Sequence, residues 1–179
     1  NDPASITKED VRKMACTLTD GPDYYLRGER SLCASEVLSL LSRYTLGLHL
    51  TPEFFYGPEA DLPTEVHGKT TPRELAEAVS EQYDRVLGYK QLPCLYRVGE
   101  SRVNPVDLFC TLCRAAAEGI GAEDEIEISV GEGKLIPMRH INTGYDWAKD
   151  WIIFPDDLDA SEIVRHALLQ TWTLKPALF

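Results

Sequence analysis

The sequence contains no apolar run approaching the ~20 residues that a membrane-spanning helix requires. It is also poor in positive charge, with 18 Lys and Arg residues against 29 Asp and Glu residues and a formal net charge of −11. A chain of this charge is a poor partner for nucleic acid or for an anionic membrane surface. We therefore expect neither a membrane span nor a nucleic-acid partner.

Short motifs of several known catalytic sites are missing as well. The sequence has no glycine-rich phosphate loop, no Gly-x-Ser-x-Gly elbow and no His-Glu-x-x-His pair. The four histidines are scattered, and the acidic runs near residues 123–127 and 156–159 lack the spacing of an EF-hand. We expect no catalytic residues, no metal and no cofactor.

The sequence begins at Asn1 and shows no charged and apolar leader. We expect an extracellular or cell-surface protein whose leader has been removed. Five cysteines, at positions 16, 33, 94, 110 and 113, cannot all pair within one chain because their number is odd. Most are expected to be buried thiols, the Cys110-x-x-Cys113 pair included, with at least one disulfide as the alternative.

The composition is that of an ordinary globular protein, with 44% hydrophobic, 26% charged and 9% aromatic residues. A chain of 179 residues can bury about 70% of its unfolded surface. We expect a single compact domain over residues 1–179, mainly α-helical and built from repeated helical hairpins with one small β-hairpin.

Two helix starts have the same form. Thr7 can cap a helix that has Asp10 at its third position, and Thr71 can cap one that has Glu74 there. Apolar residues then recur on one helical face. They are Val11, Met14, Ala15 and Leu18 after the first start, and Leu75, Ala78, Val79 and Tyr83 after the second.

Each of these helices is followed by a turn and a second helix, at residues 34–41 and 105–112, which are 71 residues apart. A third start of the same kind lies at residues 158–164, and an acid follows the cap position each time: Glu36, Asp107 and Glu162. We predict repeat units over about 6–50 and 70–119, with a partial third at 141–179. The helices of one unit should pack mainly on each other, with Leu108 and Phe109 buried.

A different pattern follows the second unit. Residues 126–130 alternate in hydrophobicity, residues 131–134 read as a turn, and residues 135–141 can form a partner strand in which Pro137 favours an edge position. This pattern predicts the one β-hairpin, as an insertion at about 126–141.

The middle of the chain carries a recognisable combination of motifs. It contains Leu92-Pro93, then Tyr96-Arg97-Val98-Gly99, then Val103-Asn104-Pro105-Val106-Asp107-Leu108-Phe109, followed by Leu112. This stretch resembles the pseudomurein-binding repeat, in which a helix, a Leu-Pro, a short Val-rich segment ending in Gly and a second helix start follow one another. The copy at 9–44 is looser, and residues 170–176 are similar to a tail of such domains in bacterial extracellular proteins. The resemblance covers about half of the chain and implies a non-catalytic, wall-binding module.

The candidate ligand-binding residues follow the predicted hairpin. If the segment is helical, Trp147 and Trp151 stack on one face, where their rings suit the C–H faces of sugars. Asn142 and Asp146 could accept hydrogen bonds from sugar hydroxyls, and Tyr145 lies beside them. The alternative is that both tryptophans are core anchors. A second candidate is the aromatic loop at residues 52–57, which can line a groove or pin itself to the core.

The leading functional hypothesis is the binding of a cell-wall or extracellular polysaccharide by one part of a larger exported protein, whose other domains are expected partners. The first alternative is a structural or protein-interaction module of such a protein. A hydrolase domain is the third hypothesis. The flanking domains of the full-length product would discriminate among them most directly.

Overall fold

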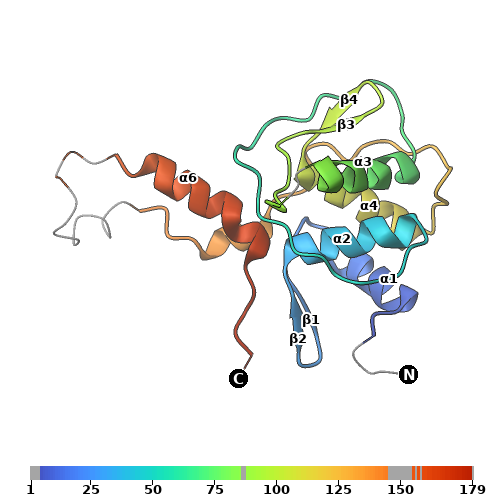
Figure 1. The fold of residues 1–179 in the computed structure, drawn as a ribbon, viewed down its shortest axis with the longest axis horizontal. Coiled ribbons are helices and arrows are strands. Elements are labelled where there is room, and N and C mark those ends of the chain that lie inside the picture. The colour runs from blue at the N-terminus through green and yellow to red at the C-terminus, as the bar shows by residue number, and fades with distance from the viewer. Residues whose placement is uncertain (1–4, 86–87, 145–154, 156, 158, 179) are drawn as a thin grey trace.

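The computed structural model describes residues 5–85, 88–144, 155, 157 and 159–178 (Figure 1). Helix α1 (Lys8–Thr17), strands β1 (Tyr25–Arg27) and β2 (Arg30–Leu32) and helix α2 (Ala34–Thr45) come first. The same order follows in helix α3 (Pro72–Arg85), strands β3 (Tyr96–Val98) and β4 (Ser101–Val103) and helix α4 (Pro105–Glu118). The short 3-10 helix η1 (Ile136–His140), helix α6 (Ser161–Leu169) and the 3-10 helix η2 (Gln170–Thr173) complete the described elements.

Helices therefore dominate the described structure, and two small antiparallel sheets accompany them. None of the described helices has both the length and the apolar character to cross a membrane. Capping boxes begin α1 and α3 as the sequence predicts. The Asp10 backbone N–H donates to the Thr7 hydroxyl at 3.2 Å, and the Glu74 N–H donates to the Thr71 hydroxyl at the same distance.

Each sheet is a hairpin closed by two residues, Gly28-Glu29 in the first and Gly99-Glu100 in the second. The glycines have φ values of +58° and +59°, a region that other residues rarely adopt. Glycine at the first of two loop positions is the pattern of a type II′ hairpin. The sequence predicted a turn without strands between the helices of each pair. The signal for a hairpin is this Gly-Glu pair between two short segments of strand-forming residues.

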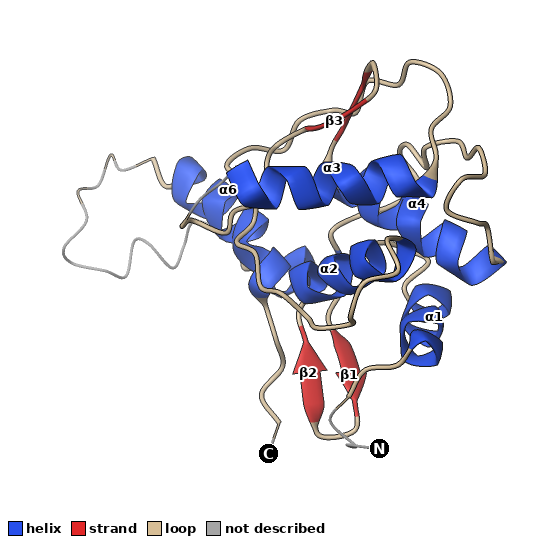
Figure 2. Ribbon diagram, turned by 45° about the vertical axis from the view of Figure 1, so that its right-hand side comes forward, coloured by secondary structure: helices blue, strands red, loops and turns tan. Residues whose placement is uncertain are grey.

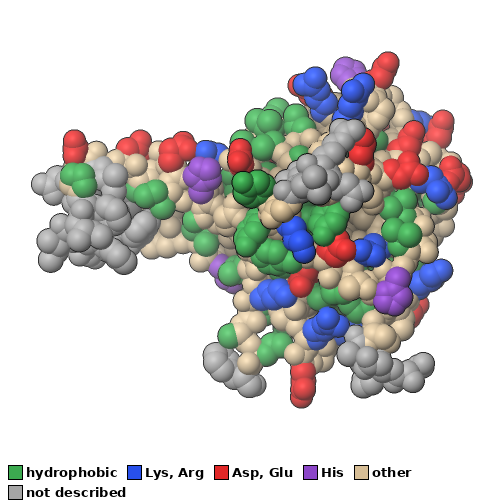
Figure 3. All heavy atoms as spheres, viewed as in Figure 1, with side chains coloured by type: hydrophobic (Ala, Val, Ile, Leu, Met, Phe, Trp, Pro, Cys, Tyr) green, Lys and Arg blue, Asp and Glu red, His purple; other side chains and the backbone are tan. Residues whose placement is uncertain are grey.

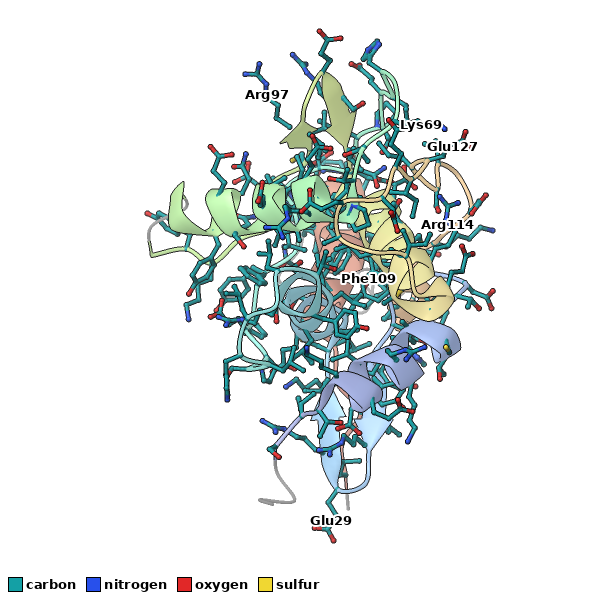
Figure 4. All side chains as sticks on the ribbon, turned by 90° about the vertical axis from the view of Figure 1, so that its right-hand side faces the viewer. Glu29, Lys69, Arg97, Phe109, Arg114 and Glu127 are labelled. Atoms are coloured by element: carbon teal, nitrogen blue, oxygen red, sulfur yellow. The ribbon has the colours of Figure 1, made fainter. Side chains whose placement is uncertain are left out.

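The two hairpins lie on opposite sides of the helices (Figure 2). The β1–β2 hairpin projects from the body, with Glu29 at its tip, whereas Arg97 of β3 lies at the other end of the molecule (Figure 4). The loop between α2 and α3 pairs with β4. The N–H groups of Glu65 and Arg102 each donate to the other residue's carbonyl at 2.8 Å.

One hydrophobic core lies between α1, α2, α3 and α4. Leu108 and Phe109 are fully buried in it, which confirms that expectation (Figure 4). The expectation that helices of one half pack mainly on each other is wrong: α1 packs chiefly on α4, and α3 chiefly on α2. Each half thus completes the core of the other. Most of the predicted core face is buried, namely Val11, Met14, Ala15, Leu18, Leu75, Ala78 and Val79, with Tyr83 partly buried.

Residues 126–141 do not form the β-hairpin that the sequence predicted. Ile126 pairs with Thr70, and the N–H groups of Lys134 and Ile136 donate to the carbonyls of Asp20 and Pro22. Both parts of this segment find backbone partners elsewhere in the chain rather than in each other. Pro137 lies at the start of η1, where its fixed φ favours a helical turn over a strand.

The C-terminal segment returns to the body through η2. Trp172 is 1% exposed and meets the Phe109 ring edge-on, with 6.4 Å between centroids. A Cβ on Gly57 would lie 2.0 Å from the Leu169 carbonyl oxygen, so only glycine allows this approach. Helix α6 itself projects from the body (Figure 1). Hydrophobic side chains gather near the place where it joins (Figure 3).

Candidate functional site

Of the residues predicted to bind a sugar, Asn142 is exposed, and its side-chain oxygen accepts a hydrogen bond from the Gly144 N–H at 2.9 Å. Tyr145, Asp146, Trp147 and Trp151 lie outside the described residues. The sugar platform at these positions therefore stays a prediction.

The aromatic loop at residues 52–57 was expected either to line a groove or to pin itself to the core, and its rings differ in this respect. Phe55 is buried and meets the Tyr83 ring edge-on, with 5.2 Å between centroids, so it pins the loop to the core. Phe54 and Tyr56 contact each other edge-on, and Tyr56 exposes half of its surface.

The main pocket lies at the start of α4 and has a volume of about 740 Å³. Its walls come from the loop at residues 58–64, the first residues of α4, the segment 130–139 and the η2 region. The residues that line it include Asp61, Thr64, Asn104, Val106, Asp107, Lys134 and Arg139. A volume in this range suits a small ligand or a side chain of a larger one.

Hydrogen bonds to the α4 cap hold one wall in place. The Asn104 side-chain oxygen accepts the Asp107 N–H at 2.9 Å, which is the expected cap. The Asn104 N–H donates to the Thr64 hydroxyl at 3.0 Å, and its side-chain amide donates to the Leu62 carbonyl at 3.1 Å. One residue therefore begins the helix and fixes the 58–64 loop beside it.

Asp107 is one of two acidic residues among the described residues that line the pocket, and it is only 4% exposed. Burial raises the pKa of its carboxyl above the ordinary value, and bonds from the Thr64 hydroxyl and the Gly131 N–H oppose that rise. The negative charges of Asp61 and Glu132 add to it. The carboxylate thus links the start of α4 to the 58–64 loop and to segment 130–139, and it lies in a locally negative environment.

Two cations line the same pocket. Arg139 donates to the Asp23 carboxylate at 3.2 Å, and its guanidinium lies over the Tyr24 ring at 5.9 Å from the centroid. Its charge is therefore paired with that of Asp23. Lys134 is exposed, so water screens its ammonium group.

Cys110 and Cys113 of α4 are buried, and Cys110 lies against segment 130–139 of the pocket wall. All five cysteines are free thiols, and all five belong to the described residues, so the disulfide alternative has no support in the structure. A Cβ on Gly133 would meet the Cys110 sulfur at 2.2 Å, so this glycine lets segment 130–139 approach α4. Burial raises the pKa of Cys110 to about 12 and also raises the pKa of Cys113. These thiols stay protonated and behave as the core residues that the sequence predicted.

The sequence indicates Asn104 and Asp107 only as residues of a helix start, and it does not predict the pocket. The opposite walls of the pocket, at residues 58–64 and 130–139, are distant in the chain, and no local pattern indicates that they meet α4. No family model, no curated protein and no solved structure matches the chain.

Proposed function

We propose that the chain is a non-catalytic module that binds a cell-wall or extracellular polysaccharide within a larger exported protein. The observation that carries the proposal is the position of the pocket. Asn104, Pro105, Val106 and Asp107, which belong to the stretch resembling the pseudomurein-binding repeat, also line the pocket. The same residues thus begin a helix and offer a recognition surface.

The two halves of the chain support a repeat origin. Residues 25–38 and 96–109 match at a constant offset of 71, with Tyr first, Gly-Glu at the hairpin turn and an acid at the third helical position. Both stretches fold as a hairpin followed directly by a helix. Repeated units that share one core and carry binding residues at equivalent places are typical of binding modules.

A protein-interaction module is the alternative, and the β1–β2 hairpin favours it. This hairpin projects from the body (Figure 2), and Leu26 exposes half of its surface there. An exposed, short two-stranded edge with an apolar side chain can pair with another protein.

Co-sedimentation with insoluble cell-wall material tests the proposal. Val106→Trp adds a large ring to the pocket wall and should reduce the bound fraction about tenfold, the loss typical of one central contact. Glu29→Trp adds the same ring at the tip of the β1–β2 hairpin and should leave binding unchanged. A wild-type protein that sediments no more with walls than with inert silica particles overturns the proposal. A loss confined to Glu29→Trp favours the protein-interaction alternative.

A further inference from the structure

The third residue of the second helix is acidic in both halves, but the two carboxylates have different surroundings. Glu36 of α2 and Asp107 of α4 occupy this position, 71 residues apart. Both residues are well shielded: the Glu36 side chain is 14% exposed, and Asp107 is 4% exposed. Because the two carboxylates occupy the same position in their helices, the partners of Glu36 indicate what kind of group Asp107 can bind.

Glu36 already holds an ammonium group. Its carboxylate accepts the Cys33 N–H at 2.9 Å and lies 2.7 Å from the side-chain nitrogen of Lys175. Lys175 comes from the C-terminal segment, which crosses the start of α2 just beyond η2. In this half the chain supplies a lysine to the acid at the helix start.

Asp107 has no such lysine among the described residues. The Asp107 carboxylate accepts hydrogen bonds from the Thr64 hydroxyl and the Gly131 N–H. An ionised carboxylate can accept about four hydrogen bonds, so two donors leave room for a further one. Asp107 lines the pocket together with Val106, Leu135 and Met138, which provide an apolar wall.

We propose that this pocket binds a primary ammonium group on an apolar stem, a lysine side chain presented by a peptide, with Asp107 as its acceptor. The inference rests on the proposed function, and it assigns to this pocket an amine-bearing peptide of the wall material rather than its sugar. The apolar wall packs on the methylene stem, as protein surfaces do around long cationic side chains. The carboxylate receives a charge-assisted hydrogen bond of the kind that Glu36 makes with Lys175.

The surrounding charges favour a cation. Asp61 lines the pocket, and Glu132 acts electrostatically on Asp107 from the neighbouring segment. Arg139 is paired with Asp23, and Lys134 remains as an exposed cation at the rim. The chain as a whole carries a net charge of −11, which raises the local concentration of cationic ligands.

Calorimetric titration of two matched peptides tests the inference. Acetyl-Gly-Lys-Gly-amide carries the ammonium group, and acetyl-Gly-norleucine-Gly-amide carries a similar stem without it. The wild-type chain should bind the lysine peptide about tenfold more tightly, because only this peptide can donate a charge-assisted hydrogen bond to the carboxylate. Equal affinities, or no binding of either peptide, overturn the inference, and this comparison requires no variant.

Variants locate the acceptor. Asp107→Asn keeps an oxygen for the Gly131 N–H but removes the charge, and it should abolish the preference for lysine. Glu36→Gln makes the same change at the equivalent position outside the pocket, and it should keep the preference. A preference that survives Asp107→Asn in a folded variant overturns the assignment.

Co-sedimentation separates this inference from the proposed function. Walls whose amines have been acetylated should bind less wild-type chain than untreated walls. Equal binding to both wall preparations leaves the wall-binding function standing and overturns the lysine site. The absence of binding to untreated walls overturns the function, while the peptide titration still decides the lysine site.

Discussion

The two halves of the molecule, residues 8–45 and 72–118, have the same elements but different environments. Hairpin β3–β4 alternates buried and exposed residues and pairs with the loop at 62–67, whereas β1–β2 projects from the body and has a half-exposed Leu26. The cap of α4 is Asn104, and the cap of α2 is Cys33, which provides no oxygen. The same local sequence pattern therefore forms one hairpin that a loop covers, β3–β4, and one that projects from the body, β1–β2.

The difference extends to the helix starts. The C-terminal segment covers the start of α2 and supplies Lys175, while the start of α4 opens into the pocket. The two halves thus share their elements, and the segments that connect them decide which helix start is covered and which opens into a pocket.

The most severe test of this comparison is truncation of the core at matched positions. Phe109 and Leu38 are fully buried, 71 residues apart, in the one shared core. Phe109→Ala should lower the free energy of unfolding by about 3–5 kcal/mol, and Leu38→Ala should lower it by about 2–5 kcal/mol. Urea denaturation measures both.

Because the halves are packed across each other, each variant should unfold in a single transition. Separate transitions for the two halves would contradict the cross-packing of α1 on α4 and of α3 on α2. Phe109→Ala should show the larger loss, since Phe109 also supports the Trp172 ring.

The two hairpin turns allow the same substitution to be compared at matching positions of the two halves. Gly28 and Gly99 have nearly identical positive φ values, and a Cβ at either position would meet no atom within 4 Å. Gly28→Ala and Gly99→Ala should therefore each cost about 1–2 kcal/mol, the backbone strain alone. Thermal or urea unfolding checks the two values. Unequal costs would mean that the β3–β4 hairpin carries a contact that the β1–β2 hairpin lacks.

Helix positions and the buried faces could be predicted because caps and apolar periodicity are local. Thr7, Thr71 and Asn104 begin helices where the sequence places them. The hairpins were missed because strands of three residues leave almost no periodicity to detect. The segment 126–141 was misread because its backbone partners, such as Thr70 and Pro22, are distant in sequence.

The candidate site could not be predicted for the same physical reason. Asp107 is a helix-start acid by sequence, as Glu36 and Glu162 are. Glu162 pairs with Arg165 three residues along the same helix, a partner that the local sequence contains. Tertiary packing distinguishes the other two, because it pairs Glu36 with Lys175 and places Asp107 at a pocket, and nothing in the local sequence records that difference.

The smallest expected effect concerns the capping acids of the two first helices. Bonds from the Thr71 N–H and the Thr70 hydroxyl lower the pKa of Glu74. Burial alone would raise the pKa of Asp10, but bonds from Thr7 and the charge of Arg27, 3.0 Å away, outweigh it, so this pKa is lowered too. Each ionised acid stabilises the folded chain above its unfolded pKa, and that contribution is lost as the pH falls through the lower, folded pKa.

Glu74→Gln and Asp10→Asn should each remove part of the stability at neutral pH, by less than about 1 kcal/mol for such solvent-exposed groups. The gap between wild type and each variant should close as the pH falls below the ordinary carboxyl pKa values of 4.5 for Glu and 3.8 for Asp. Urea denaturation at pH 7, 4 and 3 measures both gaps. Added salt should narrow the Asp10 gap more, because Arg27 contributes only there. Equal salt sensitivity would show that the two capping boxes are equivalent and that the ion pair between α1 and the β1–β2 hairpin adds nothing.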